Sequence, residues 1–148
     1  MSAIVDTARG WIGTPYRHQG ASKGAGADCL GLVRGVWREL YGREPAEVPP
    51  YTADWSEPGG DEALWRAARA HFSEKPVNDA KIGDVILFRM RNGAVAKHLG
   101  IASDIGPVAR FIHAYSGHGV VESPFSEPWA RRVVARFEFP QLTLPQEG

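Results

Sequence analysis

The chain contains a single cysteine, and its position suggests a reactive thiol. Cys29 follows Asp28 and a glycine-rich stretch at residues 20–26, at the start of a segment with helical periodicity. Asp28 is a good helix N-cap, which makes Cys29 the first residue of the helix. The free N–H groups and the helix dipole at that end stabilise a thiolate and lower the pKa of the thiol. The alternative for a lone cysteine is a small buried hydrophobe, so the surroundings of Cys29 decide between the two.

Two histidines on neighbouring predicted strands could act on this thiol. His98 and His113 flank the sequence Asp-Ile-Gly-Pro at residues 104–107. If these four residues form the loop of a hairpin, the two histidines lie directly opposite each other, with Cβ atoms ~4.5–5.5 Å apart on one face. Leu99 and Ile101 then point into a core on the other face. A slip of one residue would separate the rings, so the prediction depends on the register.

The three residues form a nucleophile, a base and a group that orients the base. Cys29 is the expected nucleophile. His98 is the expected base, which holds the thiolate as an ion pair and later protonates the leaving amine. His113 fixes the tautomer of His98. The same three side chains could instead hold a zinc ion with an open fourth position. Acyl transfer to an amine, rather than to water, is a further alternative that the residues do not separate from hydrolysis.

Three helices are expected in the first half of the chain. Residues 3–12 and 61–72 have apolar side chains at helical spacing. The longest helix begins after Asp28 and ends at Gly42, a good C-terminal stop. Gly31 and Gly35 lower its helix propensity, which predicts close packing at these positions, with the sheet as the expected partner.

Strands are expected from residue 81 onward. Residues 84–88 form a continuous apolar run, typical of a strand that is buried on both faces. Further strands are predicted at residues 98–103, 108–114, 119–122 and 131–139. Helices first and strands second indicate an α+β fold with a mostly antiparallel sheet of about five strands.

Two proline-containing stretches are expected to be irregular. Residues 44–60 hold four prolines, and we expect them to form a rim or lid of a functional site. Trp55 lies in this stretch and is a candidate for contact with a substrate. Residues 140–148 hold two more prolines and are expected to form a frayed tail.

Composition narrows the classes of function. The 148 residues carry 17 Lys and Arg against 17 Asp and Glu, which argues against a nucleic-acid partner, since phosphate recognition needs a basic surplus. This length fits one domain over residues 1–148. The sequence holds no apolar run of the ~18–20 residues that a membrane span needs. The first residues have neither a cationic nor an apolar region of a secretory signal, so synthesis in the cytoplasm is expected.

Five segments, in order, resemble the motifs of the NlpC-type cell-wall peptidases, which are papain-like cysteine peptidases of bacteria and their phages. These segments are Gly-Thr-Pro-Tyr at 13–16, Asp-Cys-Leu-Gly-Leu-Val at 28–33, Gly-Asp-Val-Ile-Leu-Phe at 83–88, His-Leu-Gly-Ile at 98–101 and Phe-Ile-His-Ala at 111–114. The resemblance implies a papain-like fold and hydrolysis of an amide in the peptidoglycan stem peptide, without a cofactor. In many members this amide joins D-glutamate to a diamino acid.

The resemblance also assigns roles to individual residues. It implies that Cys29 is the nucleophile, His98 the base and His113 the third polar residue. Tyr16 matches a tyrosine near the oxyanion site, and Asp28 matches an acidic residue that is suited to a substrate amine. Leu30 stands where the family usually has Ser or another small residue, which leaves the substrate contacts on that side open.

The phage-tail and gene-transfer-agent branch is the most similar one, on the basis of Asp-Cys-Leu-Gly, the single-domain length and the Pro-rich insert. The implied partners are the stem peptide and phage-like tail proteins. Action in the periplasm or cell wall would follow delivery by a tail particle or host lysis. The alternative is a structural tail component that keeps the fold without catalysis. His18 and His118 are expected to be loop residues, with a role at the cleft left open.

Overall fold

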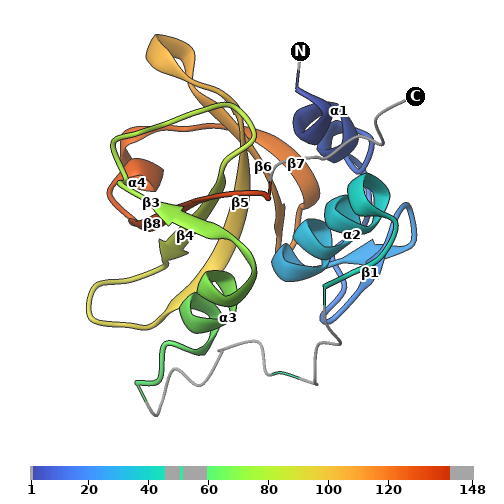
Figure 1. The fold of residues 1–148 in the computed structure, drawn as a ribbon, viewed down its shortest axis with the longest axis horizontal. Coiled ribbons are helices and arrows are strands. Elements are labelled where there is room, and N and C mark those ends of the chain that lie inside the picture. Colours follow the sequence, from blue (N-terminus) through green and yellow to red (C-terminus); the bar gives the residue numbers. More distant parts are fainter. Residues whose placement is uncertain (1, 46–50, 52–59, 141–148) are drawn as a thin grey trace, which may run out of the picture.

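A computed structural model describes residues 2–45, 51 and 60–140 of the chain. Helices α1 (Ala3–Arg9) and α2 (Cys29–Tyr41) cover one face of a sheet, and the short α4 (Glu127–Ala130) lies on the opposite face (Figure 1). Helix α3 (Ala63–His71) precedes the first strand of the main sheet. Trp55, most of the predicted lid and the predicted frayed tail from residue 141 lie outside the described residues.

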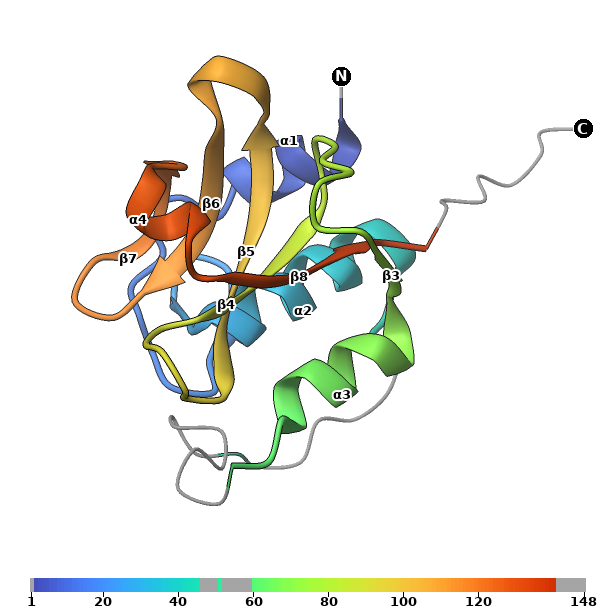
Figure 2. The ribbon, with the colours of Figure 1, turned by 90° about the vertical axis from the view of Figure 1, so that its left-hand side faces the viewer.

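The main sheet has six strands in the order β3-β8-β4-β5-β6-β7, and every pair in it is antiparallel. Figure 2 shows its middle strands passing in front of α2. The predicted α+β architecture is confirmed. The strands are β3 (Ser73–Lys75), β4 (Val85–Arg89), β5 (Ala96–Asp104), β6 (Arg110–Tyr115), β7 (Gly119–Pro124) and β8 (Val133–Glu138), and a separate small hairpin joins β1 (Ala21–Ser22) to β2 (Gly26–Ala27).

Each face of the sheet has its own hydrophobic core. The larger core lies between the helices and one face, and includes Leu32, Leu87 and Ile101. The smaller core lies on the α4 side, where Trp129 packs against a set formed by Ile86, Phe88, Ala102 and Phe111. Val85, Ile86, Leu87 and Phe88 in β4 are all buried, which confirms the strand that was predicted to be covered on both faces.

Local capping rules account for both ends of α2. The Asp28 carboxylate accepts a hydrogen bond of 2.7 Å from the Gly31 backbone N–H, and Gly42 ends the helix with a φ of 91°. The αL conformation at this position favours glycine, because it has no Cβ to clash with the backbone. The predicted start of the helix at Cys29 and its end before Gly42 are both confirmed.

The two glycines within α2 are required by close contacts, but the contacts are not with the sheet. A Cβ at position 31 would lie 1.6 Å from the Gly20 carbonyl oxygen. A Cβ at position 35 would lie 2.1 Å from the Trp11 ring. The expected packing partner was therefore wrong. The glycines let the loop around Gly20 and the Trp11 ring pack directly onto α2, and this fixes the loop that precedes Cys29.

The hairpin of β5 and β6 differs from the predicted register by two residues. Ile101 lies opposite Ile112, whereas the predicted loop would place it opposite Arg110. A bulge at Ser103 and a 3-10 turn at Gly106–Val108 lengthen the connection. Because side chains alternate with a period of two, a shift of two residues keeps both histidines on one face. The histidines are therefore diagonal neighbours instead of directly opposed ones.

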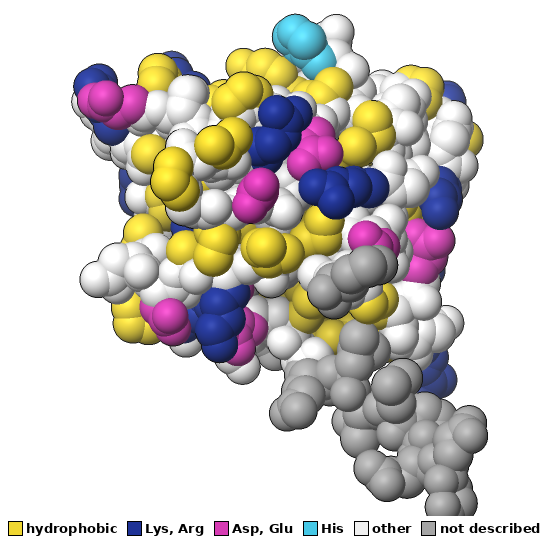
Figure 3. Space-filling view, turned by 90° about the horizontal axis from the view of Figure 1, so that it is seen from above, with side chains coloured by type: hydrophobic (Ala, Val, Ile, Leu, Met, Phe, Trp, Pro, Cys, Tyr) yellow, Lys and Arg dark blue, Asp and Glu magenta, His cyan; other side chains and the backbone are white. Residues whose placement is uncertain are grey.

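The exterior is mixed in character. On the face shown in Figure 3, hydrophobic side chains lie between acidic and basic ones. Among the described residues, no helix combines the length and the apolar character that are needed to cross a bilayer.

Candidate active site

A pocket of about 140 Å³ brings together four of the five predicted site residues, Tyr16, Asp28, Cys29 and His98. They come from the loop before β1, the N-terminus of α2 and the beginning of β5. The remaining lining residues are His18, Tyr51, Met90, Lys97, Ala114, Tyr115 and Ser116. His113 is not among the lining residues; it lies on the neighbouring strand β6 and contacts His98 there.

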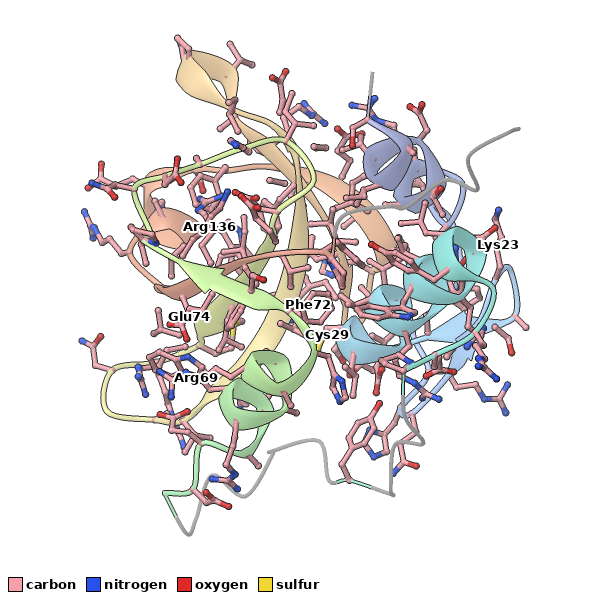
Figure 4. The ribbon with its side chains drawn as sticks, viewed as in Figure 1. Lys23, Cys29, Arg69, Phe72, Glu74 and Arg136 are labelled. Carbon is pink, nitrogen blue, oxygen red and sulfur yellow. The ribbon has the colours of Figure 1, made fainter. Side chains whose placement is uncertain are left out.

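The sulfur of Cys29 lies beside the backbone of β5 (Figure 4). It hydrogen-bonds to the Lys97 carbonyl oxygen at 3.7 Å. Lys97 is the extra residue of a β-bulge, because Phe88 pairs with His98 while Arg89 pairs with Ala96. Bulges re-aim neighbouring groups, and this one presents the carbonyl next to His98 to the sulfur. In the described residues no hydrogen bond joins the sulfur to an imidazole nitrogen, so the resting thiol is directed to the main chain.

The two histidines form a buried pair. His98 Nε2 and His113 Nδ1 are 2.7 Å apart, and the side chains are 6% and 1% exposed. The aromatic rings of Phe88 and Trp129 lie next to His98, with centroid distances of 5.7 and 5.6 Å. Since Nε2 of His98 is used by His113, Nδ1 is the nitrogen that remains for the thiol. The predicted association of the two rings is present, with the diagonal geometry given above.

Burial favours the neutral forms of both reactive groups. Desolvation, followed by the nearby Asp28 charge, raises the pKa of the Cys29 thiol to about 12, against the opposing effect of backbone N–H groups. Desolvation and the neighbouring His113 lower the pKa of His98 to about 3. The resting site therefore holds a thiol and a neutral imidazole. This differs from the thiolate–imidazolium ion pair expected from the sequence. The helix N-terminus favours a thiolate, but the burial of the sulfur, which the sequence does not show, favours the neutral thiol.

The buried histidines make the stability of the fold depend on pH. Burial lowers the pKa of His113 to about 4 and that of His98 to about 3, whereas an unfolded histidine titrates near 6.5. Below pH 6.5 the unfolded state binds more protons, so the free energy of unfolding should fall as the pH falls, by about 1.4 kcal/mol per pH unit for each histidine. Urea unfolding at pH 7, 6 and 5 measures this slope.

The matched control for this titration is His113→Gln, which should remove one histidine's share of the slope between pH 6.5 and 5. A wild-type free energy of unfolding that stays constant over this range would contradict the neutral buried pair.

Asp28 joins three parts of the site. Its Oδ1 accepts from Gly31 N, and its Oδ2 accepts from Gln19 N at 2.7 Å and from the Tyr51 hydroxyl at 2.5 Å. A carboxylate has about four lone-pair positions, so three of them are used within the protein. Asp28 therefore positions the loop, the helix end and Tyr51. Its predicted contact with a substrate amine stays a prediction.

Tyr16 contributes a hydroxyl from the wall of the pocket. The residue forms an isolated parallel bridge with Ala27, which holds its backbone close to the start of α2. Desolvation, with the Cys29 and Asp28 charges, raises the pKa of Tyr16 to about 12. The phenol therefore keeps its proton at neutral pH and can donate a hydrogen bond. Its predicted role at the oxyanion remains a prediction.

Several residues of the site have no clear signal in the sequence. Tyr51 lies in the Pro-rich stretch, and both Tyr51 and His18 line the pocket. The Tyr51 carbonyl oxygen is 3.0 Å from His18 Nε2. His118 is exposed and stacks on Tyr115. Ser123 hydrogen-bonds to His113, and only the pairing of β6 with β7 reveals this contact. Tyr115 and Ser116 could have been suspected, because Tyr115 is the last residue of the strand that carries His113 and Ser116 follows it.

The zinc alternative needs at least three ligands that converge. In the described part of the chain, no group of three or more His, Cys, Asp or Glu side chains is arranged to hold a metal ion. His98 and His113 direct one ring nitrogen each toward the other, which is a hydrogen-bonding arrangement.

Comparison with known proteins connects this geometry to characterised relatives. A murein DD-endopeptidase/murein LD-carboxypeptidase of Escherichia coli, MepS, is 32% identical over an aligned length of 142 residues, and the alignment covers 91% of this chain and 64% of that protein. The chain thus spans less than two thirds of that relative's length. A gamma-DL-glutamyl hydrolase of Bacillus subtilis is 30% identical over 146 residues, which are 98% of this chain and 31% of that protein.

A solved structure and a family profile agree with these relatives. The NlpC/P60 domain of the peptidoglycan hydrolase SagA superposes with a TM-score of 0.64 at 25% identity, over 93% of this chain and 97% of that one. The profile of the NlpC/P60 family matches residues 13–138, a range that contains the cysteine, both histidines and the whole antiparallel sheet. The chain therefore belongs to the NlpC/P60 family.

Proposed function

We propose that this chain is a cysteine endopeptidase that hydrolyses an amide bond in peptidoglycan stem peptides. The observation that carries the proposal is the shared pocket of Cys29 and His98, with His113 bonded to the far side of His98. A thiol, an imidazole and a third polar group in this order are the parts that acyl-transfer chemistry on an amide requires. The similarity to a murein endopeptidase and to a gamma-DL-glutamyl hydrolase supports a cell-wall substrate.

The first chemical step starts from the neutral pair. When a substrate carbonyl enters the pocket, the thiol turns from the Lys97 carbonyl toward His98. Nδ1 of His98 takes the proton as the sulfur attacks the carbonyl carbon. The backbone N–H of Cys29 has no acceptor within its helix and, together with the Tyr16 hydroxyl, stabilises the oxyanion.

The intermediate then breaks down in two stages. The C–N bond breaks as His98 returns its proton to the leaving amine, which leaves a thioester on Cys29. Water, deprotonated by the now neutral His98, attacks the thioester carbon. The C–S bond then breaks, the sulfur takes the proton from His98 to restore the thiol, and the carboxylic acid leaves. His113 accepts the Nε2–H of His98 throughout, so that the ring keeps the orientation and the tautomer that both stages use.

The bond that we propose is the one between D-glutamate and a diamino acid. The resemblance of the five motifs supports it, and the gamma-DL-glutamyl hydrolase among the relatives shares the glutamyl class. The murein DD-endopeptidase among the relatives acts, by its description, on a different bond, so the choice of bond is tested separately from the hydrolase activity.

Association with a tail-like particle is a separate part of the proposal, together with action at the cell wall after delivery by the particle or by lysis. It is supported by the Asp-Cys-Leu-Gly motif and the Pro-rich insert. Mass spectrometry of purified tail-like particles from the producing cells tests it. Absence of the chain from such particles would contradict this part and leave the hydrolase proposal intact.

Digestion of purified peptidoglycan with the wild-type chain, followed by mass spectrometry of the soluble products, tests the reaction. We expect new fragments with a free diamino-acid amine, and none in a parallel digest with Cys29→Ala. Fragments cut at the D,D cross-link would redirect the proposal to that bond. Intact peptidoglycan after a long incubation with folded wild-type chain would overturn it.

A further inference from the structure

Ser123 in β7 contacts the side of His113 that faces away from His98. Its hydroxyl oxygen is 2.9 Å from His113 Nε2. Ser123 pairs with Phe111 in the sheet, and His113 pairs with Val121, so Ser123 and His113 are diagonal neighbours on one face. Three adjacent strands thus carry a continuous row of hydrogen-bonding groups, His98 in β5, His113 in β6 and Ser123 in β7.

The protonation states along this row follow from the role of the base. A neutral His98 that accepts a proton at Nδ1 must carry its hydrogen on Nε2, and it donates that hydrogen to His113 Nδ1. His113 then carries its own hydrogen on Nε2, where it needs an acceptor. The Ser123 oxygen is that acceptor. In the opposite arrangement His98 would hold its hydrogen on Nδ1 and could not act as a base.

We propose that Ser123 is a positioning residue of the active site, which selects the tautomer of His113 and, through it, the basic form of His98. The proposal rests on the proposed function for its kinetic part. The hydrogen bond to Ser123 matters most after His98 has taken the thiol proton. Both nitrogens of His98 are then donors, so His113 must accept from His98 at Nδ1 and donate to Ser123 at Nε2. Ser123 contacts neither the pocket nor the sulfur in the structure, so it acts through His113.

The surroundings define what else can influence the titration of the pair. Tyr115 and His118, from β6 and the turn after it, and Arg132 after α4 lie near the two histidines. The other titratable groups of the pocket that His98 lines are Tyr16, His18, Asp28, Cys29, Tyr51 and Lys97. Each variant below leaves these groups unchanged, so a shift in the pH profile reports on position 123.

The kinetic test compares Ser123→Ala, Ser123→Thr and Ser123→Asp on a stem peptide. We expect Ser123→Ala to lower kcat about three- to tenfold with KM unchanged, which corresponds to one hydrogen bond. Ser123→Thr keeps the hydroxyl and should restore most of the activity. Ser123→Asp is an acceptor with a negative charge, and should move the acidic limb of the kcat/KM profile to higher pH. Ser126→Ala is the matched control, because the Ser126 side chain makes no capping bond and lies three residues away.

A second readout does not depend on catalysis. ¹⁵N NMR of the imidazole nitrogens should show His113 with its hydrogen on Nε2 in the wild type, and a mixture of tautomers in Ser123→Ala. If the wild type cleaves no stem peptide but the tautomer changes in this way, the proposed function fails while the role of Ser123 stands. The proposal is overturned if Ser123→Ala keeps the wild-type tautomer and kcat, or if Ser123→Thr loses as much kcat as Ser123→Ala.

Discussion

Cys29→Ala is expected to abolish the cleavage of stem peptides while the fold remains intact. Loss of the nucleophile leaves only the oxyanion donors and substrate binding, and such losses reduce kcat on the order of 10³–10⁶-fold. The Asp28 cap and the contacts of Gly31 do not involve the sulfur, so α2 keeps its start. Single-turnover assays on a defined stem peptide measure the rate, and thermal unfolding checks the fold.

Cys29→Ser sharpens this experiment, because it retains a hydrogen-bonding group of similar size beside the Lys97 carbonyl. A serine hydroxyl is much less acidic than a thiol, and its C–O bond is shorter than the C–S bond, so the oxygen is harder to deprotonate and lies farther from His98. We therefore expect Cys29→Ser to be nearly as inactive as the alanine variant. If Cys29→Ala cleaved the peptide at the wild-type rate, the nucleophile assignment would be wrong.

Asp84→Ala is expected to cause the largest loss of stability. The Asp84 carboxylate is 2% exposed and lies 2.8 Å from Lys75 Nζ and 3.1 Å from Arg136 Nη1. It also accepts from the Lys81 backbone N–H at 2.7 Å. Removing it leaves the buried Arg136 guanidinium without its carboxylate and takes one of two carboxylate partners from the half-buried Lys75, which keeps Glu138; we expect a cost of about 3–5 kcal/mol. For a chain of this size the loss lowers Tm on the order of 10 °C.

Asp61→Ala is the matched control, because it removes an aspartate that pairs with Arg66 on the surface. Exposed ion pairs contribute little, so its Tm should stay close to that of the wild type. Differential scanning calorimetry of both variants makes the comparison. Equal shifts in Tm for Asp84→Ala and Asp61→Ala would show that the buried cluster of Asp84, Lys75 and Arg136 is not a main determinant of stability.

The part of the fold that the sequence predicts well is governed by local rules. Asp28 and Gly42 mark the ends of α2, because an N-cap acceptor and an αL glycine act within one turn of the helix. The buried strand β4 is recognisable from its continuous apolar run. By contrast, β1, β2 and β3 contain only two or three residues each, which is too short for a periodic pattern to form.

The histidine pair shows where a pattern gives the correct face and the wrong pairing. The alternation of side chains with a period of two fixes the face of the sheet on which His98 and His113 lie. Registers that differ by two residues place both side chains on the same face, so the alternation does not distinguish between them. The bulge at Ser103 and the length of the connection after it decide between them. The sequence indicates a turn at residues 104–107, but it indicates neither the bulge nor the added length.

The protonation state of the site depends on contacts that are distant in the sequence. The helix terminus suggested a thiolate at Cys29, whereas the packing of β5 over the sulfur and the Asp28 charge favour the thiol. Tyr51 and Ser123 reach the site from segments 22 and 94 positions after Cys29. Only the folded arrangement reveals that they belong to it.

The bulge residue Lys97 has consequences for how this enzyme family could diversify. Its main-chain oxygen accepts the Cys29 thiol hydrogen, and the residue lines the pocket. A mutation at this codon changes the charge or the size that an incoming peptide meets, yet the oxygen stays, because every amino acid supplies one. Evolution can therefore alter substrate preference at this position without disturbing the resting place of the sulfur.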